Sequence, residues 1–350
     1  MEKKSFRVGL IGYGRSGRDI HAWAAKRTNG RFSVEAISDI TENRRIQAAA
    51  ENTCPVYVDY REMAEKEDLD LFVVTSFSNQ HIPISIDLLN RKKAVLCEKP
   101  LTNSNEEFEE LAAVIKKTGA FFTSFHNLRY EPSFVKIREW INDGLIGEIM
   151  QIKMNAGQFS RRWDWQMSRA LGGGTLMVSG VHILDLALCL AGEGYEPEVK
   201  SSLKHHGVGD ADNYAKVLLT SGDGPIIDIE CSYFDAFPGP RYHIQGALGT
   251  IIGADNKVEV KFYDPNAAPP ISLETAPIQN AEGNPAFCKE ELPVQTQSWS
   301  HRSNLYHASF LAYYDHLYRA LTGHAEAPVS LDELRKQVRV LDACYKDAKL

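Results

Sequence analysis

Three features that mark other protein classes are missing from this 350-residue sequence: a Cys-x-x-C pair, an apolar run of bilayer length and an excess of positive charge. The six cysteines are scattered, which favours reduced, buried thiols over a disulfide framework or a zinc site. Apolar stretches are interrupted within about ten residues, far short of the roughly 20 that span a bilayer. The net charge of −7 attracts neither phosphate backbones nor anionic lipid. We therefore expect no metal, no membrane and no nucleic acid among its partners.

The start of the sequence has little in common with a secretory leader. Lys3 and Lys4 precede an apolar run that is too short and too rich in glycine for a signal-peptide core. We therefore expect a cytoplasmic protein. Its length exceeds the roughly 250 to 300 residues that one hydrophobic core usually organises, so two domains are expected.

Apolar segments alternate with helix-forming segments through the first 125 residues. Apolar strands separated by helices indicate a parallel sheet that is covered on both faces. Right-handed crossovers then make the sheet doubly wound. The predicted strands read RVGLIGYG, SVEAISD, PVYVD, LDLFVVTS, KAVLCEKP and AFFTSF in chain order.

A glycine-rich pattern lies between the first predicted strand and the first helix. Gly12, Gly14 and Gly17 form G-x-G-x-x-G, which binds dinucleotides when it opens a βαβ unit. Gly12 permits a tight turn, Gly14 lets the backbone approach a pyrophosphate, and Gly17 lets the helix pack closely on the strand. The alternative is a glycine turn without a ligand.

Asp39 ends the second predicted strand, 22 positions after Gly17. An acid about 20 residues beyond the glycines accepts a hydrogen bond from the ribose 2′-hydroxyl and repels a 2′-phosphate. The sequence therefore favours NAD over NADP as the cofactor. Arg44 and Arg45 lie a turn further on and weaken that preference.

Lys99 follows the fifth predicted strand, between Glu98 and Pro100. Ligands of open α/β sheets bind beyond the carboxyl ends of the strands. A dehydrogenase must take a proton from a hydroxyl group as hydride leaves the same carbon, and a nearby nicotinamide cation lowers the pKa of a lysine. Pro100 biases Lys99 toward extended backbone, with a cis bond as a further option. A solvated lysine at a strand end is the alternative.

At these residues the chain resembles the Gfo/Idh/MocA oxidoreductase family over nearly its whole length. The resemblance implies an α/β fold with a doubly wound Rossmann domain, residues 1–126, and an α+β domain, residues 127–350. The second domain of this family has an open, mostly antiparallel sheet that holds the substrate and often an oligomer interface. The motifs are GLIGYGRSG, SNQH, VLCEKPLT, NLRYEPSFVKIREWINDGLIGEI and GGGTLMVSGVHILDL.

The resemblance also implies a set of site residues. His182 is expected to be the general base and Lys99 to bond the reacting oxygen, or the two roles are exchanged. Expected substrate contacts are Asn127, Arg129, Tyr130, Trp163, Trp165 and Asp185. Expected cofactor contacts, in addition to the three glycines and Asp39, are Tyr13, Arg15, Ser16, Ser76, His81, Glu98 and Lys99.

His182 lies on an apolar helix that is predicted from about Ser179 to just before Gly192. His182, Asp185 and Cys189 share one stripe of this helix. A buried histidine bonded to a carbonyl, with Asp185 paired to an arginine, is the alternative to a catalytic stripe. The family commonly has an acid four residues before the histidine, where this chain has Val178. Either His182 and Lys99 suffice, another acid such as Asp185 substitutes, or the chemistry differs. A further hypothesis is that valine makes room for an apolar part of the substrate.

The segment FSRRWDWQ, residues 159–166, interleaves basic and aromatic residues. We expect it to form a loop at the mouth of a sugar-sized pocket, where tryptophan offers an apolar face to C–H groups. A plain surface loop is the alternative.

After residue 195 the sequence predicts a meander of short strands. Residues 264–293 contain six of the fifteen prolines, with little periodicity, and are predicted to be a functional or partner-contacting arm. Two helices close the chain, and Ser330 with Glu333 predicts a capping box at the start of the second.

These features together predict an NAD-dependent oxidoreductase that acts on a secondary hydroxyl of a sugar, glycoside or inositol-like cyclic polyol. One alternative is a hydrolase or lyase that retains NAD and eliminates an aglycone after transient oxidation of the sugar. Another is a non-catalytic NAD(H)-binding regulator. The resemblance implies a homodimer or homotetramer formed through the C-terminal sheet.

Overall fold

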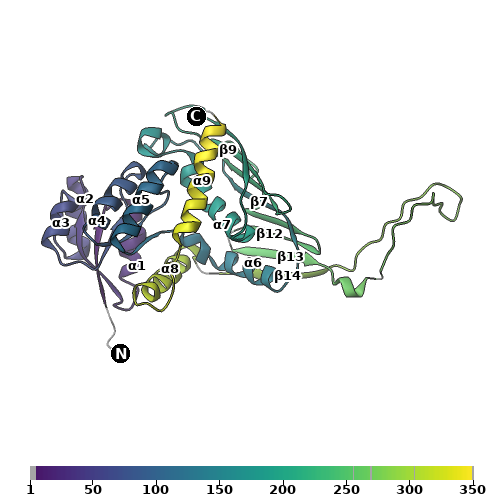
Figure 1. Cartoon of the computed structure of the whole chain (residues 1–350), viewed down its shortest axis with the longest axis horizontal. Helices are drawn as coiled ribbons and strands as arrows, with labels where there is room; N and C mark the ends of the chain where they lie inside the picture. The colour runs from purple at the N-terminus through teal and green to yellow at the C-terminus, as the bar shows by residue number, and fades with distance from the viewer. Residues whose placement is uncertain (1–4, 255, 269, 303, 349–350) are drawn as a thin grey trace.

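The computed structural model describes residues 5–254, 256–268, 270–302 and 304–348, and these residues form two lobes, each built on one sheet (Figure 1). The sheet of the first lobe has six strands in the order β3-β2-β1-β4-β5-β6, and every neighbouring pair is parallel. The predicted doubly wound sheet is therefore confirmed. Its strands are β1 (Phe6–Ile11), β2 (Phe32–Ser38), β3 (Val56–Tyr57), β4 (Leu71–Val74), β5 (Ala94–Cys97) and β6 (Phe122–Ser124).

Helices connect these strands and cover both faces of the sheet. Strands β4 and β5 are apolar throughout, and β1 is apolar except for the half-buried Arg7, because both faces of these strands are buried. The helical segments are η1 (Ser16–Ala22) with α1 (Trp23–Ala25), α2 (Glu42–Asn52), α3 (Tyr60–Lys66), η2 (Ser78–Gln80), α4 (His81–Asn90) and α5 (Asn105–Thr118).

The sheet of the second lobe has eight strands in the order β14-β13-β12-β11-β7-β10-β9-β8. The predicted meander is only partly right, because β7 inserts between β11 and β10 and runs parallel to β10. A meander is inferred from neighbouring segments, and β7 comes from much earlier in the chain. The strands are β7 (Ile149–Gly157), β8 (Glu198–Lys204), β9 (Tyr214–Thr220), β10 (Ile226–Ser232), β11 (Tyr242–Gly246), β12 (Gly249–Ala254), β13 (Lys257–Phe262) and β14 (Gln295–Ser300).

Helices pack on one face of the second sheet and bury alternate residues of its strands. The opposite face, called the open face below, keeps partly exposed side chains on β9, β10 and β12. The helical segments are η3 (Asn127–Tyr130), α6 (Pro132–Asn142), η4 (Trp165–Met167), η5 (Arg169–Leu171), η6 (Leu176–Gly180), α7 (Val181–Ala191), η7 (Pro265–Ala267), α8 (Leu305–Leu321) and α9 (Leu331–Asp347).

The two closing helices return to the first lobe, as Figure 1 shows for α8 and α9. Phe310, Tyr313, Tyr314 and Leu317 of α8 belong to the core around β1 and β2. Helix α9 packs on both lobes, and the predicted capping box at its start is confirmed. The predicted division at residue 126 separates the strands of the two sheets along the chain. The packed first lobe, however, also includes α8, which follows that division.

The stretch Arg169–Ala191 has the length and hydropathy of a membrane-spanning helix, but 67% of its most apolar window is buried inside the protein. Its apolar side chains form the core between α7 and the second sheet. This is the composition expected of a core helix.

Candidate functional site

The glycine loop after β1 leaves its backbone open at the carboxyl end of the first sheet. A Cβ on Gly17 would lie 2.0 Å from the carbonyl oxygen of Gly12, so only glycine lets the helix start here. Gly12 has φ +97°, which favours glycine. A Cβ on Gly14 would meet only the Arg44 guanidinium, at 3.6 Å. The loop therefore has the close approach and the exposed backbone that a pyrophosphate requires.

Asp39 lies beside this loop and is 5% exposed. One carboxylate oxygen accepts from the backbone N–H of Tyr13 and the other from that of Thr41, each at 2.7 Å. Arg44 approaches the carboxylate to 3.7 Å. Asp39 thus shapes the loop, and the side chain of Tyr13 turns away from the loop to bond Glu51 and Asn52.

Arg15 and Ser16 lie at the open end of the glycine loop. Arg15 is exposed, and Ser16 is the first residue of η1. Their contact with a bound dinucleotide stays a prediction.

Three other predicted cofactor contacts, Ser76, His81 and Glu98, are bonded within the protein. The hydroxyl of Ser76 donates to the backbone carbonyl of Phe77 at 3.3 Å. His81 is 2% exposed, and its ring nitrogens face the backbone carbonyls of Pro100 and Ser76, at 2.7 and 3.2 Å. Glu98 is 4% exposed and lies 3.2 Å from Nε2 of His21. We therefore assign His81 and Glu98 a positioning role in place of the predicted contact, because their polar atoms join the loops that form the cleft.

Lys99 lies two residues after the end of β5, and its peptide bond to Pro100 is cis. Its side chain is half-buried, and Nζ donates a hydrogen bond to the backbone carbonyl of Val178, at 3.1 Å. Val178 belongs to η6, and His182 follows one helical turn later, on the same side of the continuous helix. The fold thus joins Lys99 of the first lobe to the helix of the second lobe that carries His182.

The surroundings of these two groups favour their uncharged forms. The pKa of His182 lies well below its ordinary value of 6.5, first because of burial and next because of the positive charge of Lys99. The pKa of Lys99 is lowered from 10.5, chiefly by burial; the carboxylate of Glu98 opposes this shift, and Arg15 and Arg162 add to it. A neutral imidazole at neutral pH is a proton acceptor.

His126 is a further buried histidine close enough to His182 to affect its pKa, and the sequence analysis missed it. It is 1% exposed, and neither ring nitrogen has a hydrogen-bond partner among the described residues. Nδ1 of His126 lies 3.6 Å from the carboxylate of Asp185. Burial is the main cause of the lowered pKa of His126. Its place in the sequence could have indicated a site residue, because His126 follows β6 at the same edge of the sheet as Lys99.

The helix that carries His182 begins at Leu176, three residues before the predicted start. The reason is tertiary: the buried carboxylate of Asp212 accepts the backbone N–H of Leu176 at 2.9 Å and the hydroxyl of Tyr345 at 2.8 Å. Gly174, with φ +117°, passes so close that a Cβ would lie 2.2 Å from that carboxylate. The glycine run therefore fixes the start of the helix.

Arg129 and Asp185 form an ion pair at the junction of the two lobes. The guanidinium donates to both carboxylate oxygens at 2.7 Å and also contacts Glu333. Gln337 donates to Asp185 as well, at 3.2 Å. This pairing with an arginine is the alternative that the sequence left open for Asp185, so we assign Arg129 and Asp185 a positioning role in place of the predicted substrate contact.

Asn127 and Tyr130 are also bonded within the protein. Asn127 is 5% exposed and donates to the hydroxyl of Ser309, whereas the hydroxyl of Tyr130 bonds His316 at 2.7 Å. Both partners belong to α8. The structure therefore argues for docking of α8, and against the predicted substrate contacts, at these two positions.

The loop with Trp163 and Trp165 docks against the segment that follows β4. The Trp165 ring meets Phe77 edge-on, with 5.2 Å between ring centroids. Asn79 donates to the carbonyl of Ala170 at 2.9 Å. Trp163 is 75% exposed. This loop thus bridges the two lobes beside the glycine run, and its place at the mouth of a substrate pocket stays a prediction.

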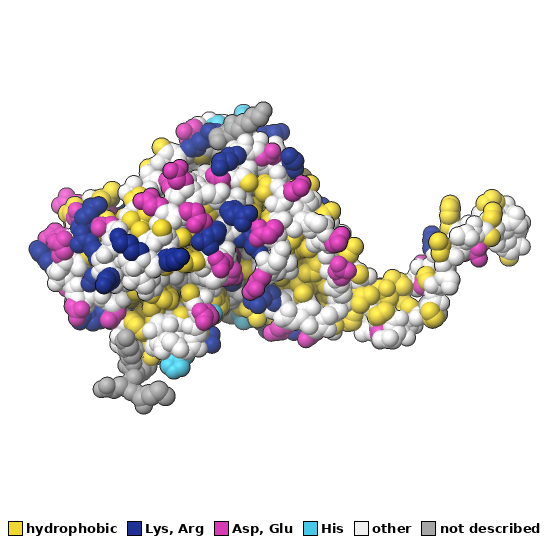
Figure 2. All heavy atoms as spheres, in the orientation of Figure 1, with side chains coloured by type: hydrophobic (Ala, Val, Ile, Leu, Met, Phe, Trp, Pro, Cys, Tyr) yellow, Lys and Arg dark blue, Asp and Glu magenta, His cyan; other side chains and the backbone are white. Residues whose placement is uncertain are grey.

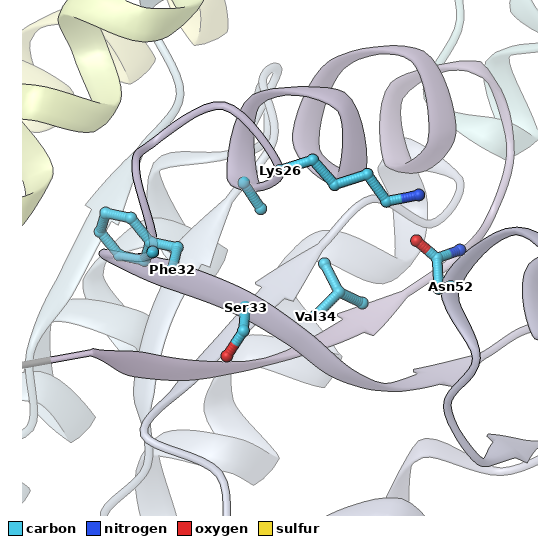
Figure 3. Close-up of a pocket in the computed structure, with 7 residues that line it drawn as sticks. Lys26, Phe32, Ser33, Val34 and Asn52 are labelled. Atoms are coloured by element: carbon cyan, nitrogen blue, oxygen red, sulfur yellow. The ribbon is translucent and has the colours of Figure 1, made fainter.

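A surface pocket lies at the opposite end of the first sheet. Figure 3 shows Lys26 and Asn52 above residues 32–34, at the start of β2. Nζ of Lys26 donates to the carbonyl of Glu51 at 2.8 Å. Dinucleotides bind at the carboxyl ends of the strands, so this pocket lies outside the candidate site. Among the described residues, no cluster of three His, Cys, Asp or Glu side chains suits a metal ion.

Two family models match the chain. Residues 6–126 match GFO_IDH_MocA, the oxidoreductase family with an NAD-binding Rossmann fold, and residues 134–252 match the GFO/IDH/MocA C-terminal domain. The NADP⁺-dependent scyllo-inositol 2-dehydrogenase IolW of Bacillus subtilis is 23% identical over 99% of this chain and 94% of its own length. The inositol 2-dehydrogenase of Rhizobium meliloti is 26% identical over 76% of this chain and 81% of its own.

Solved structures have the same fold. Levoglucosan dehydrogenase in complex with NADH and levoglucosan superposes with a TM-score of 0.82 and 16% identity, over 99% of this chain and 98% of the other. The two-lobed arrangement is thus that of known NADH-binding dehydrogenases.

Proposed function

Because the chain belongs to the Gfo/Idh/MocA family of NAD-binding oxidoreductases, we propose that it is a dehydrogenase that oxidises a secondary hydroxyl of a sugar, glycoside or inositol-like cyclic polyol. Inositol and levoglucosan dehydrogenases among the similar proteins support this substrate class. We further propose that it works in the cytoplasm.

The residues of the glycine loop fit NAD. Gly12 and Gly17 form a cradle that a Cβ would fill, and the backbone at Gly14 faces outward. We propose that Arg15 and Ser16 contact the pyrophosphate and that Asp39 accepts a hydrogen bond from the adenosine ribose; Arg15 is exposed, and Asp39 lies beside the loop. When bound, NAD accepts a hydride at nicotinamide C4.

The protein's own contribution is to handle the hydroxyl proton. In the proposed mechanism His182, neutral because of its lowered pKa, accepts that proton as the C–H bond breaks. Lys99 donates a hydrogen bond to the reacting oxygen and holds it near His182. The roles of the two groups are exchanged in the alternative assignment. The positive charges of Arg15 and Arg162 lower the pKa of Lys99 and so favour loss of a proton from its ammonium group, as the alternative assignment requires.

One observation carries this proposal: Nζ of Lys99 bonds the backbone of the helical turn that precedes His182. The amine of one domain thus contacts the helix that carries the imidazole of the other, and the charge of Lys99 acts on the pKa of His182. Both side chains are half-buried, and therefore accessible to a small molecule.

The experiment that tests the function is a screen for NADH formation with sugars, glycosides and inositols. Turnover of a polyol or sugar with stoichiometric NADH supports the proposal. Release of an aglycone with NAD retained would establish the lyase alternative. This alternative remains because Val178 stands where the family commonly has an acid. NAD binding with no turnover across the panel would favour a regulator.

A variant tests the catalytic assignment. Lys99→Ala is expected to leave NAD affinity unchanged and to lower kcat at least about a hundredfold, because the hydrogen bond to the reacting oxygen is lost. NAD affinity is measured by fluorescence titration, and turnover by NADH absorbance. Lys93→Ala is the matched control, since Lys93 precedes the same strand at its opposite end. Turnover near the wild-type rate in Lys99→Ala would remove Lys99 from the mechanism.

We also propose that two or four copies associate through the open face of the second sheet. Leu218, Ile226 and Ile252 are 41 to 43% exposed on this face. Ion pairs such as Lys216 with Asp228 lie among them. A mixed apolar and charged face of this kind suits a self-complementary interface.

A further inference from the structure

Residues 264–293, called the arm below, leave the body of the protein between β13 and β14. Figure 1 shows that the arm projects far beyond the second sheet, and Figure 2 shows hydrophobic side chains along the arm. Ile271 is 80% exposed, Leu273 90% and Phe287 93%. Three large apolar side chains this exposed within one segment mark a candidate interaction surface.

The described part of the arm is ordered mainly by contacts within itself. Asn280 donates to the carbonyl of Asn284, and Ala286 to that of Ile278, which closes a hairpin at the tip. Between residues 265 and 288 the only charged side chains are Glu274 and Glu282. The six prolines limit the freedom of the chain, which lowers the entropy lost when the arm is immobilised. The arm is thus built for an apolar partner surface.

We propose that the arm packs on a second copy of this chain and buries Ile271, Leu273 and Phe287 in the interface between the two copies. The proposal is independent of the reaction proposed above. It rests on self-association through the open face, and it adds the segment that clasps the partner.

The place where the arm starts favours a second copy over a different protein. The arm connects β13 to β14 at the edge of the sheet whose open face has exposed Leu218, Ile226 and Ile252. A copy that docks on this face lies next to the base of the arm. Two-fold symmetry then places the arm of each copy on the other copy, so that both arms are buried in the interface.

The edge strand β14 supports the same partner. It reads Gln-Thr-Gln-Ser-Trp-Ser, lacks charge and proline, and is exposed along most of its length. Strand edges that stay exposed in a monomer are usually protected by lysine, proline or a bulge. An edge without these devices is expected to be covered, and the arm of a second copy would reach it.

Cys288 provides a direct probe, because it is the exposed cysteine among the six. Burial raises the pKa of Cys54 to about 11 and of Cys189 to about 12, which makes these half-buried thiols slow to react. The experiment follows thiol labelling of the native full-length protein by a maleimide, together with sedimentation velocity. In the assembled protein Cys288 is expected to react at least about tenfold more slowly than after dilution to monomers.

Three variants complete the test. Ile271→Ser, Leu273→Ser and Phe287→Ser are combined in one chain, and this change is expected to weaken self-association about a hundredfold. The matched control is Ile46→Ser with Val58→Ser, because these side chains are 62% and 57% exposed on the first lobe. The control is expected to associate as the wild type does. Ile252→Lys tests the open face separately.

Two results would overturn the inference. A chain that is monomeric at every concentration, with Cys288 labelled rapidly, would remove both the arm contact and association through the open face. Association that Ile252→Lys abolishes but the arm variant retains, with Cys288 rapidly labelled in the assembled protein, would remove the arm contact alone. Neither result bears on NADH formation, so the proposed reaction is tested apart from the arm.

Discussion

His182 has two properties that a proton acceptor needs: a lowered pKa and partial exposure. Its Nδ1 has no hydrogen-bond partner among the described residues, and the positive neighbours disfavour a second proton on the ring. The family commonly has an acid at the position of Val178. Because valine has no polar side-chain atom, Lys99 bonds the backbone carbonyl of Val178. At the scale of single residues, the site thus relies on burial and positive charge in place of a carboxylate next to His182.

The pH dependence of oxidation follows from these shifts. Because the folded-state pKa of His182 lies below 6.5, the ring stays neutral as the pH falls to that value, and kcat/KM is expected to decline only at lower pH. The lowered pKa of Lys99 predicts an alkaline decline that begins below pH 10.5. The measurement is the pH profile of kcat/KM. An acid limb centred above 6.5 would contradict the assignment of His182, and Lys99→Arg is expected to displace the alkaline limb upward.

Val178 offers a second test at this scale. Val178→Asp places a carboxylate near Lys99, which raises the lysine pKa and replaces an apolar surface by a charged one. We expect a changed ranking of substrates, with those that carry apolar groups losing most in kcat/KM. Val178→Asn is the matched control, because it has nearly the same size without the charge. Unchanged rate and preference in Val178→Asp would show that valine makes no room for the substrate.

At the scale of elements, the helix that carries His182 depends on the glycine run before it. Gly174 has φ +117° and lies against Asp212, whereas Gly207 has φ +95° with nothing within 4 Å of its missing Cβ. Both positions strain an alanine, but only the first also forces a collision with the carboxylate that holds the start of the helix.

Gly174→Ala is therefore expected to lower the free energy of unfolding by about 2 kcal/mol more than Gly207→Ala, since the clash adds to the backbone strain. Urea denaturation of both variants measures this difference. Equal losses would mean that the contact with Asp212 does not hold the helix. Gly174→Ala is also expected to lower kcat, because His182 shifts with its helix.

At the scale of the whole molecule, α8 and α9 join the lobes. Helix α8 follows the second sheet in sequence but supplies Phe310, Tyr313, Tyr314 and Leu317 to the core of the first lobe. Helix α9 contributes Val338 to one core and Leu341 to the other. Neither lobe is complete without these helices, so one cooperative unfolding transition is expected.

Leu317→Ala tests this coupling. The fully buried side chain leaves a cavity, which is expected to cost about 2 to 5 kcal/mol of the free energy of unfolding. Tyr306→Ala is the control, since Tyr306 is 53% exposed on the same helix and its loss is expected to cost less than about 0.5 kcal/mol. Unfolding is followed by circular dichroism and by tryptophan fluorescence. Two separate transitions, with only one affected by Leu317→Ala, would show that the lobes unfold independently.

The sequence by itself determined the Rossmann sheet, the glycine loop, the acid at Asp39 and the family, because these depend on short-range patterns: strand and helix periodicity, glycine spacing and motifs of a few residues. It also placed α8 and the capping box of α9 correctly. Tertiary structure alone decided that β7 inserts beside β10, that α8 joins the first lobe, and that Asp212 starts the helix of His182. It also decided that Asn127, Arg129, Tyr130 and Asp185 are bonded within the protein, and that His126 is buried at the site. The physical reason is that periodicity shows which face of an element is buried, whereas the partner on that face is chosen by packing between segments far apart in the chain.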